Sequence, residues 1–238
     1  MFKANKKIIF KSIKFYNSSF NYIINNLLKS GGYLVAPAAS SLSEIKTNKI
    51  YYRSLINSNF AIFDSGFFCL LLRFFKRTKV KKFSGYLFLK LLLEKKSIKN
   101  KKFFLVNPNQ KEQIKNINLL RSKKIFNIRS YCAPLYNLSN YKDYKLLNEI
   151  KNFKPNIIII NIGGGIQEPL GEFLNSHFKT KAIILCTGAA IGFLNGIQAP
   201  ITSFYDRYYL GWLIRLIHKP TNYFPRIIKS LNLIKFFY

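Results

Sequence analysis

The sequence predicts a layered α/β fold in which helices cover a mostly parallel sheet, and three observations lead to this prediction. From about Gly32 onward, short apolar runs alternate with longer amphipathic ones, which is typical of strand–helix units. The run at 156–160 is continuous and β-branched, as expected of a strand with both faces covered. The chain has 238 residues and is 49% hydrophobic, which is enough for a packed core.

The segments expected to form strands are short apolar runs bounded by turn residues. They are 33–36, 60–63, 102–106, 125–130, 156–160 and 182–186. Longer segments with helical spacing lie between or after these strands, at 42–57, 67–75, 86–95, 112–122, 144–153 and 167–178. Turn residues close two of the strands, at 64–66 and 107–109. The expected fold is therefore a Rossmann-like layered domain.

The last part of the chain differs from the rest, because it has a helical pattern and no further strand. An apolar stripe is formed by Trp212, Leu213, Leu216 and Ile217. The cations of this part are Arg207, Arg215, Lys219, Arg226, Lys229 and Lys235, against the single acid Asp206. We therefore expect three parts: a basic N-terminal segment (1–31), an α/β core (32–204) and a basic C-terminal helical appendage (205–238) suited to a membrane surface.

The chain carries a strong positive charge. It has 39 Lys and Arg against 9 Asp and Glu, a formal net charge of +30. Such a charge indicates an anionic partner, which is a nucleic acid, a phosphate-bearing substrate or an acidic membrane surface. Composition does not choose among these three.

The scarcity of acids limits the chemistry. A general base must come from the nine carboxylates, from His177 or His218, or from a less usual group. No Asp-x-Asp pair is present, so divalent-metal catalysis by such a motif is not expected. The three cysteines have no CxxC or Cys/His spacing, which predicts neither a disulfide framework nor a zinc site and fits a reduced compartment. We expect no metal, no cofactor, no signal peptide and no membrane-spanning helix.

Three strand-to-helix turns could hold an anionic ligand, because ligands of parallel sheets bind at the carboxyl ends of strands. The first turn contains Asp64. The second contains three successive glycines, Gly163, Gly164 and Gly165, which could point N–H groups at phosphate. The third contains Thr187 and Gly188. Structural roles also fit these turns: Asp64 could cap a helix, and a glycine-rich turn could simply be tight.

The stretch from Pro155 to about Pro220 carries four motifs in a fixed order. They are Gly163-Gly164-Gly165-Ile166-Gln167-Glu168, Gly188-Ala189-Ala190-Ile191-Gly192-Phe193-Leu194-Asn195-Gly196, Ala199-Pro200 and Leu210-Gly211-Trp212-Leu213-Ile214-Arg215-Leu216. In order and spacing this stretch resembles the WecG/TagA/CpsF glycosyltransferase family. Weaker similarity upstream covers 60–66, where a strand ends in an acidic residue, and Lys82-Phe83-Ser84-Gly85.

Some positions depart from the pattern of that family. The departures are Ala38 for Asn, Lys82 for Arg, Gly165-Ile166 for Pro-Lys, Gly211 for Glu, and Thr221-Asn222 for a pair of Arg. They indicate a divergent branch with a different sugar or acceptor, or a homologue that binds a nucleotide sugar without turnover.

The resemblance implies transfer of N-acetylmannosamine, or a related sugar, from a UDP-sugar to a polyprenyl-diphosphate-linked acceptor in bacterial surface polysaccharide synthesis. It implies an inverting reaction without a bound metal, with Asp64 as the base. The residues expected to bind the substrates are Gly163, Gly164, Gly165, Gln167, Glu168, Thr187, Gly188, Lys82, Arg215 and Arg226.

The resemblance further implies a peripheral protein on the cytoplasmic face of the membrane, and it is compatible with a small homo-oligomer. The alternative from another class is a basic nucleic-acid-binding protein, motivated by the charge and by 16% aromatic residues. The cations are spread over the chain and no RNA- or DNA-binding module is visible, so we expect no nucleic-acid partner.

Overall fold

The computed structural model describes residues 6–178, 180–200, 205 and 209–238. Within these residues, eight strands form one sheet in the order β1-β2-β4-β3-β8-β7-β5-β6. The strands are β1 (Lys6–Phe10), β2 (Ile13–Asn17), β3 (Gly32–Val35), β4 (Phe60–Ala61), β5 (Phe103–Asn107), β6 (Ile128–Cys132), β7 (Ile157–Ile160) and β8 (Ile183–Cys186). Only the β1–β2 hairpin is antiparallel among the described pairs, which confirms the predicted mostly parallel α/β fold.

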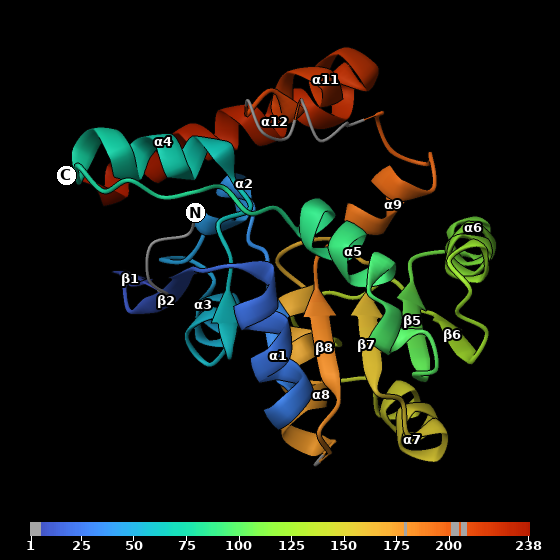
Figure 1. Cartoon of the computed structure of the whole chain (residues 1–238). Coiled ribbons are helices and arrows are strands. Elements are labelled where there is room, and N and C mark those ends of the chain that lie inside the picture. Colours follow the sequence, from blue (N-terminus) through green and yellow to red (C-terminus); the bar gives the residue numbers. More distant parts are fainter. Residues whose placement is uncertain (1–5, 179, 201–204, 206–208) are drawn as a thin grey trace.

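Helices cover both faces of the sheet (Figure 1). They are α1 (Phe20–Ser30), α2 (Ala39–Leu42), α3 (Lys49–Ile56), α4 (Gly66–Phe75), α5 (Gly85–Glu94), α6 (Gln110–Ser122), α7 (Tyr144–Phe153), α8 (Gln167–His177), α9 (Ala190–Leu194), α11 (Gly211–His218) and α12 (Pro220–Leu231), with the 3-10 helices η1 (Lys96–Ile98) and η2 (Asn232–Phe236). One core lies under α3, α7 and α8, and the other under α1, α5 and α6.

Strand β7 shows why this sequence forms a central strand. All four of its isoleucines are buried. Because successive side chains point to opposite faces, Ile158 and Ile160 enter one core while Ile157 and Ile159 enter the other. The six strands expected from 33 onward are all present, although β4 is shorter than predicted and β6 begins only at Ile128.

The single helix expected over 42–57 is wrong in its first half. Helix α2 ends at Leu42 and α3 begins at Lys49. The Asn48 side chain accepts a hydrogen bond from the Tyr51 N–H at 2.9 Å and so caps α3. Apolar spacing continues across this break and hides it, because Ile45 in the turn is buried.

The N-terminal residues 6–30 form elements that were not expected from the sequence pattern. Strands β1 and β2 form an edge hairpin whose turn residues, Lys11 and Ser12, both have positive φ values (45° and 62°). Helix α1 is capped by Ser19 and buries Ile23, Ile24 and Leu27. These residues extend the same sheet and core. The proposed boundary between residues 31 and 32 remains a prediction.

The C-terminal residues are helical, as expected. Helices α11 and α12 lie across the end of the molecule toward which strands β7 and β8 point (Figure 1). After α12 the chain returns to the hairpin, where the Phe237 ring lies 5.1 Å from that of Phe10 and 6.4 Å from that of Phe68. The boundary expected at 204 falls at residues outside the described part.

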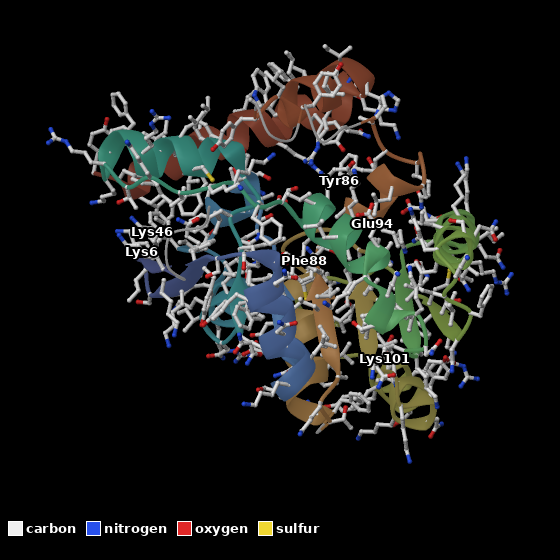
Figure 2. The ribbon with its side chains drawn as sticks, in the orientation of Figure 1. Lys6, Lys46, Tyr86, Phe88, Glu94 and Lys101 are labelled. Atoms are coloured by element: carbon white, nitrogen blue, oxygen red, sulfur yellow. The ribbon has the colours of Figure 1, made fainter. Side chains whose placement is uncertain are left out.

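Cationic side chains occur at distant parts of the molecule. Figure 2 places Lys6 and Lys46 near the hairpin and Lys101 at a distant part of the molecule. The charge alone therefore does not mark the site.

Candidate functional site

Asp64 lies just beyond β4 at the carboxyl edge of the sheet. Its Oδ1 accepts a hydrogen bond from the Gly85 N–H at 2.8 Å. The helix that follows is capped by Ser65, whose Oγ accepts from the Phe68 N–H at 3.2 Å. Ser65 rather than Asp64 therefore caps α4, and the Asp64 carboxylate instead binds the first N–H of α5.

Gly85 joins the Asp64 loop to two neighbouring strands. A Cβ atom at this position would lie 3.1 Å from the Thr187 Cβ and 3.3 Å from the Ala36 Cβ. The ends of β3, β4 and β8 therefore converge there. The Thr187 hydroxyl is buried and has no hydrogen-bond partner among the described residues.

The two glycine loops are joined through the side chains of Gln167 and Glu168. Glu168 Oε2 accepts from the Gly165 N–H at 2.7 Å, and its Oε1 accepts from Gln167 Nε2 at 3.0 Å. Gln167 Oε1 in turn accepts from the Gly188 N–H at 2.7 Å. Both side chains are buried, with 2% and 1% of the residue exposed. Their binding of a donor sugar or nucleotide remains a prediction.

The buried position of Glu168 changes its protonation. Burial raises the pKa of Glu168 to about 7, although its hydrogen bonds from Gly165 and Gln167 act in the opposite direction. Burial also raises the pKa values of the neighbouring Tyr51 hydroxyl and Cys186 thiol well above their usual ranges. Glu168 is therefore the carboxyl here that titrates near neutrality.

The first two glycines of the second loop remain open. Among the described residues, the N–H groups of Gly163 and Gly164 have no acceptor, whereas those of Gly165 and Gly188 are engaged. A Cβ on Gly163 would meet no atom within 4 Å, and one on Gly164 would lie 3.2 Å from Ser41 Oγ. Gly163 and Gly164 are therefore the glycines whose N–H groups are accessible to a ligand, and phosphate binding there remains a prediction.

The expected cations occupy different surroundings. Lys82 lies beside the Asp64 loop, because the N–H of the next residue, Phe83, donates to the Phe63 carbonyl at 2.9 Å. The Lys82 Nζ lies 5.9 Å from the centre of the Tyr209 ring. The Tyr209 ring in turn packs on Gly66, where a Cβ would come within 2.5 Å of it.

The two C-terminal arginines do not share one environment. Arg215 stacks on Phe193 of α9, with 4.6 Å between guanidinium and ring centre. Arg226 is exposed on α12 and lies 5.5 Å from the Tyr223 ring centre. Lys82 and Arg215 therefore approach the carboxyl edge through these contacts. The described contacts do not join Arg226 to the glycine loops.

A largely buried group of asparagine amides also lies at this edge, and the sequence pattern does not predict it. The Asn107 Oδ1 accepts from Asn116 Nδ2 at 2.7 Å and from Asn161 Nδ2 at 3.2 Å, while Asn195 Nδ2 donates to Asn116 at 2.5 Å. Asn107 ends β5, whose connection through α6 leads to β6. Asn161 follows the neighbouring strand β7, whose connection through α8 leads in the opposite direction, to β8. Such switch points form ligand crevices. Asn is so common in this chain that asparagines alone do not indicate the amide group. The predicted turn at 107–109 was the only sign of it in the sequence.

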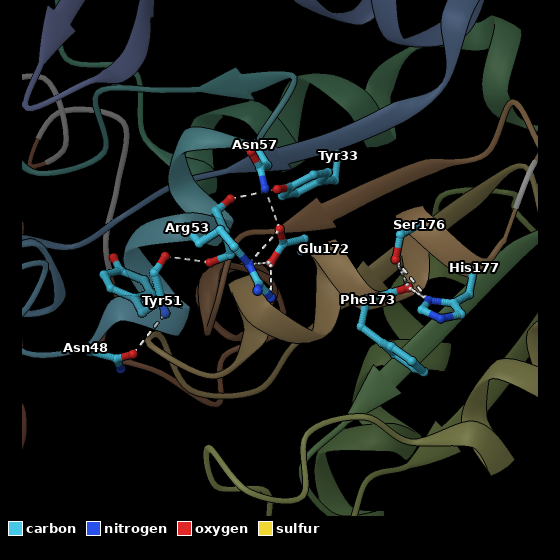
Figure 3. Close-up of polar contacts among 10 residues, drawn as sticks. Tyr33, Asn48, Tyr51, Arg53, Asn57, Glu172, Phe173, Ser176 and His177 are labelled. Carbon is cyan, nitrogen blue, oxygen red and sulfur yellow. Dashed lines mark hydrogen bonds and ion pairs between the residues drawn. The ribbon is translucent and has the colours of Figure 1, made fainter.

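His177 lies away from the edge that carries Asp64. It ends α8, where its Nδ1 is 2.9 Å from Ser176 Oγ and 2.8 Å from Phe173 O (Figure 3). On the same helix, Glu172 ties α8 to α3 through Arg53 at 3.3 Å and Asn57 at 2.6 Å. These polar groups hold helices together at a distance from the strand ends.

The described residues contain no group of three His, Cys, Asp or Glu side chains that could hold a metal ion. Among the same residues, no helix has both the length and the apolar character needed to cross a membrane.

A parallel sheet with a carboxylate and open glycine N–H groups at one edge is typical of an enzyme that acts on a phosphate-bearing substrate. The family model described as "Glycosyl transferase WecG/TagA/CpsF family" matches residues 9–238. The chain therefore belongs to this family and is a glycosyltransferase of cell-surface polysaccharide synthesis, which confirms the resemblance and extends it to nearly the whole chain. A comparison with curated proteins gave no match.

Proposed function

We propose that the protein transfers N-acetylmannosamine, or a related sugar, from a UDP-sugar to a polyprenyl-diphosphate-linked acceptor, with inversion and without a bound metal. The observation that carries the proposal is the placement of Asp64 and the two glycine loops at one edge of the sheet, linked through Gly85 and Thr187. This edge offers a base for the acceptor and N–H groups for the leaving diphosphate.

In the proposed reaction an acceptor hydroxyl attacks the anomeric carbon of the donor sugar. Asp64 takes the hydroxyl proton as the new C–O bond forms. The bond from the anomeric carbon to UDP breaks, and its electron pair passes to the β-phosphate oxygen. The N–H groups of Gly163 and Gly164, with Lys82 and Arg215, stabilise the charge on that diphosphate.

The amide group around Asn161 is suited to the nucleoside part of the donor. The Asn161 Oδ1 is buried and has no hydrogen-bond partner within the described part of the chain. Amide side chains supply both donors and acceptors, which is what the edge of a uracil ring requires.

We propose an anionic membrane surface as a further partner, since the acceptor is a lipid. Helices α11 and α12 expose several large apolar side chains, which are Trp212, Leu213, Ile217, Phe224, Ile228 and Leu231. The exposed cations are Arg226 on α12 and Lys219 between the two helices, whereas Lys229 is paired with Glu44. Helices of this composition bind the membrane interface, and each well-placed cation adds about 1 kcal/mol near acidic lipid. We further propose a peripheral position on the cytoplasmic face of the membrane, and a small homo-oligomer remains a prediction.

The first test replaces the proposed base. Asp64→Asn keeps the shape of the side chain but removes its basicity, so the turnover number should fall by about 10²- to 10⁴-fold. Turnover is measured with a panel of UDP-sugars and a short-chain polyprenyl-diphosphate glycan, with product mass as the readout. The matched control is Glu94→Gln at an exposed position on α5, which should leave turnover unchanged.

Three outcomes would contradict the proposal. Wild-type turnover by a folded Asp64→Asn variant would remove Asp64 as the base. Donor binding without turnover by the wild-type protein would identify a binding protein. Tight, sequence-specific binding of RNA or DNA over a salt titration would favour the nucleic-acid alternative.

A further inference from the structure

The hydrogen bonds between the glycine loops form one continuous chain. It runs from the Gly165 N–H to Glu168, from Gln167 Nε2 to Glu168, and from the Gly188 N–H to Gln167, with donor–acceptor distances of 2.7, 3.0 and 2.7 Å. The two loops follow β7 and β8, which are neighbours in the sheet. Two adjacent side chains of α8 therefore tie both loops together.

We infer that Gln167 and Glu168 are positioning residues. They hold the two glycine loops in one arrangement, in which the Gly163 and Gly164 N–H groups are presented to the diphosphate of the donor. The identity of that ligand rests on the proposed function, but the hydrogen-bond chain does not.

Burial and the existing hydrogen bonds support a role through the loops rather than through direct contact. Each polar atom of the two side chains already has a protein partner, and only 2% of Gln167 and 1% of Glu168 is exposed. The backbone carbonyl of Gln167 also accepts a hydrogen bond from Cys186 Sγ at 3.3 Å. Direct contact with a donor sugar would require these buried atoms to become exposed.

The chain has a polarity that can be reversed. Both Glu168 oxygens act as acceptors, which forces Gln167 to turn its Nε2 toward Glu168 and its Oε1 toward Gly188. In Glu168→Gln, one end of the new amide is a donor. Gln167 must then flip, and its NH₂ faces the Gly188 N–H with no acceptor between them.

Exchanging the two residues restores every bond. In the double variant Gln167→Glu/Glu168→Gln, the amide at 168 accepts from Gly165 and donates to the carboxylate at 167, which accepts from Gly188. The double variant has the composition and charge of the wild-type protein. The double variant is expected to preserve the loops. It also places a carboxylate at position 167, so any direct contact between the Gln167 amide and the donor substrate would be lost.

The test uses the full chain without ligand and then with UDP. Amide hydrogen exchange at Gly188 and Gly165 reports the loops, and calorimetry reports the Kd of UDP. We expect Glu168→Gln to speed exchange at Gly188 about tenfold and to weaken UDP binding about tenfold. The double variant should return both quantities to within about threefold of the wild-type values.

Two results would overturn the inference. Unchanged exchange at Gly188 in Glu168→Gln would show that the bonds do not hold the loop. Restored exchange without restored UDP binding in the double variant would show that Gln167 or Glu168 touches the donor. If the single variant does not fold, the double variant decides between these by itself. Restored exchange in a protein that never binds UDP would uphold the positioning role and reject the proposed donor.

Discussion

At the scale of single residues, Glu168 makes the clearest prediction, because its buried carboxyl titrates near neutrality. Folding raises its pKa from 4.5 to about 7, so the folded state binds the proton more tightly than the unfolded chain. The stability from this proton is fully present below pH 4.5 and is lost as the pH rises to about 7. Glutamine does not titrate, so Glu168→Gln lacks this loss. The difference in the free energy of unfolding between Glu168→Gln and the wild-type protein should therefore shift by roughly 2 to 4 kcal/mol in favour of the variant between pH 4.5 and about 7.

Denaturant unfolding of both proteins between pH 4 and 8 measures this difference. The neighbouring Tyr51 and Cys186 do not interfere, since burial keeps their pKa values far above the window. The exposed Glu94→Gln substitution is the control and should follow the wild-type curve. Parallel curves for Glu168→Gln and the wild-type protein would contradict a buried, titrating Glu168.

At the scale of elements, α11 exposes an apolar stripe that suits a membrane surface. Trp212 and Ile217 are 53% and 71% exposed, so charge at these positions should leave the fold intact. Burying two such side chains in the interface is worth about 3 kcal/mol or more. The double variant Trp212→Glu/Ile217→Glu should therefore lose at least about tenfold in affinity for anionic vesicles, measured by flotation.

The matched control for this measurement is Phe126→Glu. Phe126 is 73% exposed but precedes β6, at the opposite edge of the sheet from the strand ends. It should float with anionic vesicles as well as the wild-type protein does. Undiminished flotation of the α11 variant would exclude this stripe as the anchor.

At the scale of the whole molecule, the end of the chain completes the core beside the N-terminal hairpin. Phe237 is 8% exposed and packs on Phe10 and Phe68. Phe237→Ala should therefore lower the free energy of unfolding by about 3 kcal/mol. Removing residues 205–238 as a block would expose the same aromatic cluster, so point variants give the cleaner test of membrane binding.

Chemical denaturation measures the effect of Phe237→Ala. The control is Tyr238→Ala, which alters the adjacent side chain. Because Tyr238 is 87% exposed, its loss should change the free energy of unfolding by less than about 0.5 kcal/mol. Wild-type stability of the Phe237→Ala variant would show that Phe237 does not contribute to the core.

Local pattern was informative where burial is complete and ambiguous where it is partial. The isoleucines of β7 and the amphipathic span of α7 predicted those elements almost to the residue. The β1–β2 hairpin escaped prediction because its lysine-rich residues alternate weakly and sit at an edge. The break between α2 and α3 escaped because its only strong signal is the Asn48 cap.

The sequence by itself determined the strand–helix order, the carboxylate at Asp64, the glycine turns and the family to which the chain belongs. These are properties of short segments, in which residue type and spacing are sufficient. The tertiary structure alone decided that Gly165 and Gly188 are engaged, that Gly163 and Gly164 are open, and that Gln167 and Glu168 face the loops. The reason is physical. A hydrogen bond between loops depends on the distance between them, which is set by the order of the strands in the sheet, and the linear sequence does not specify that order.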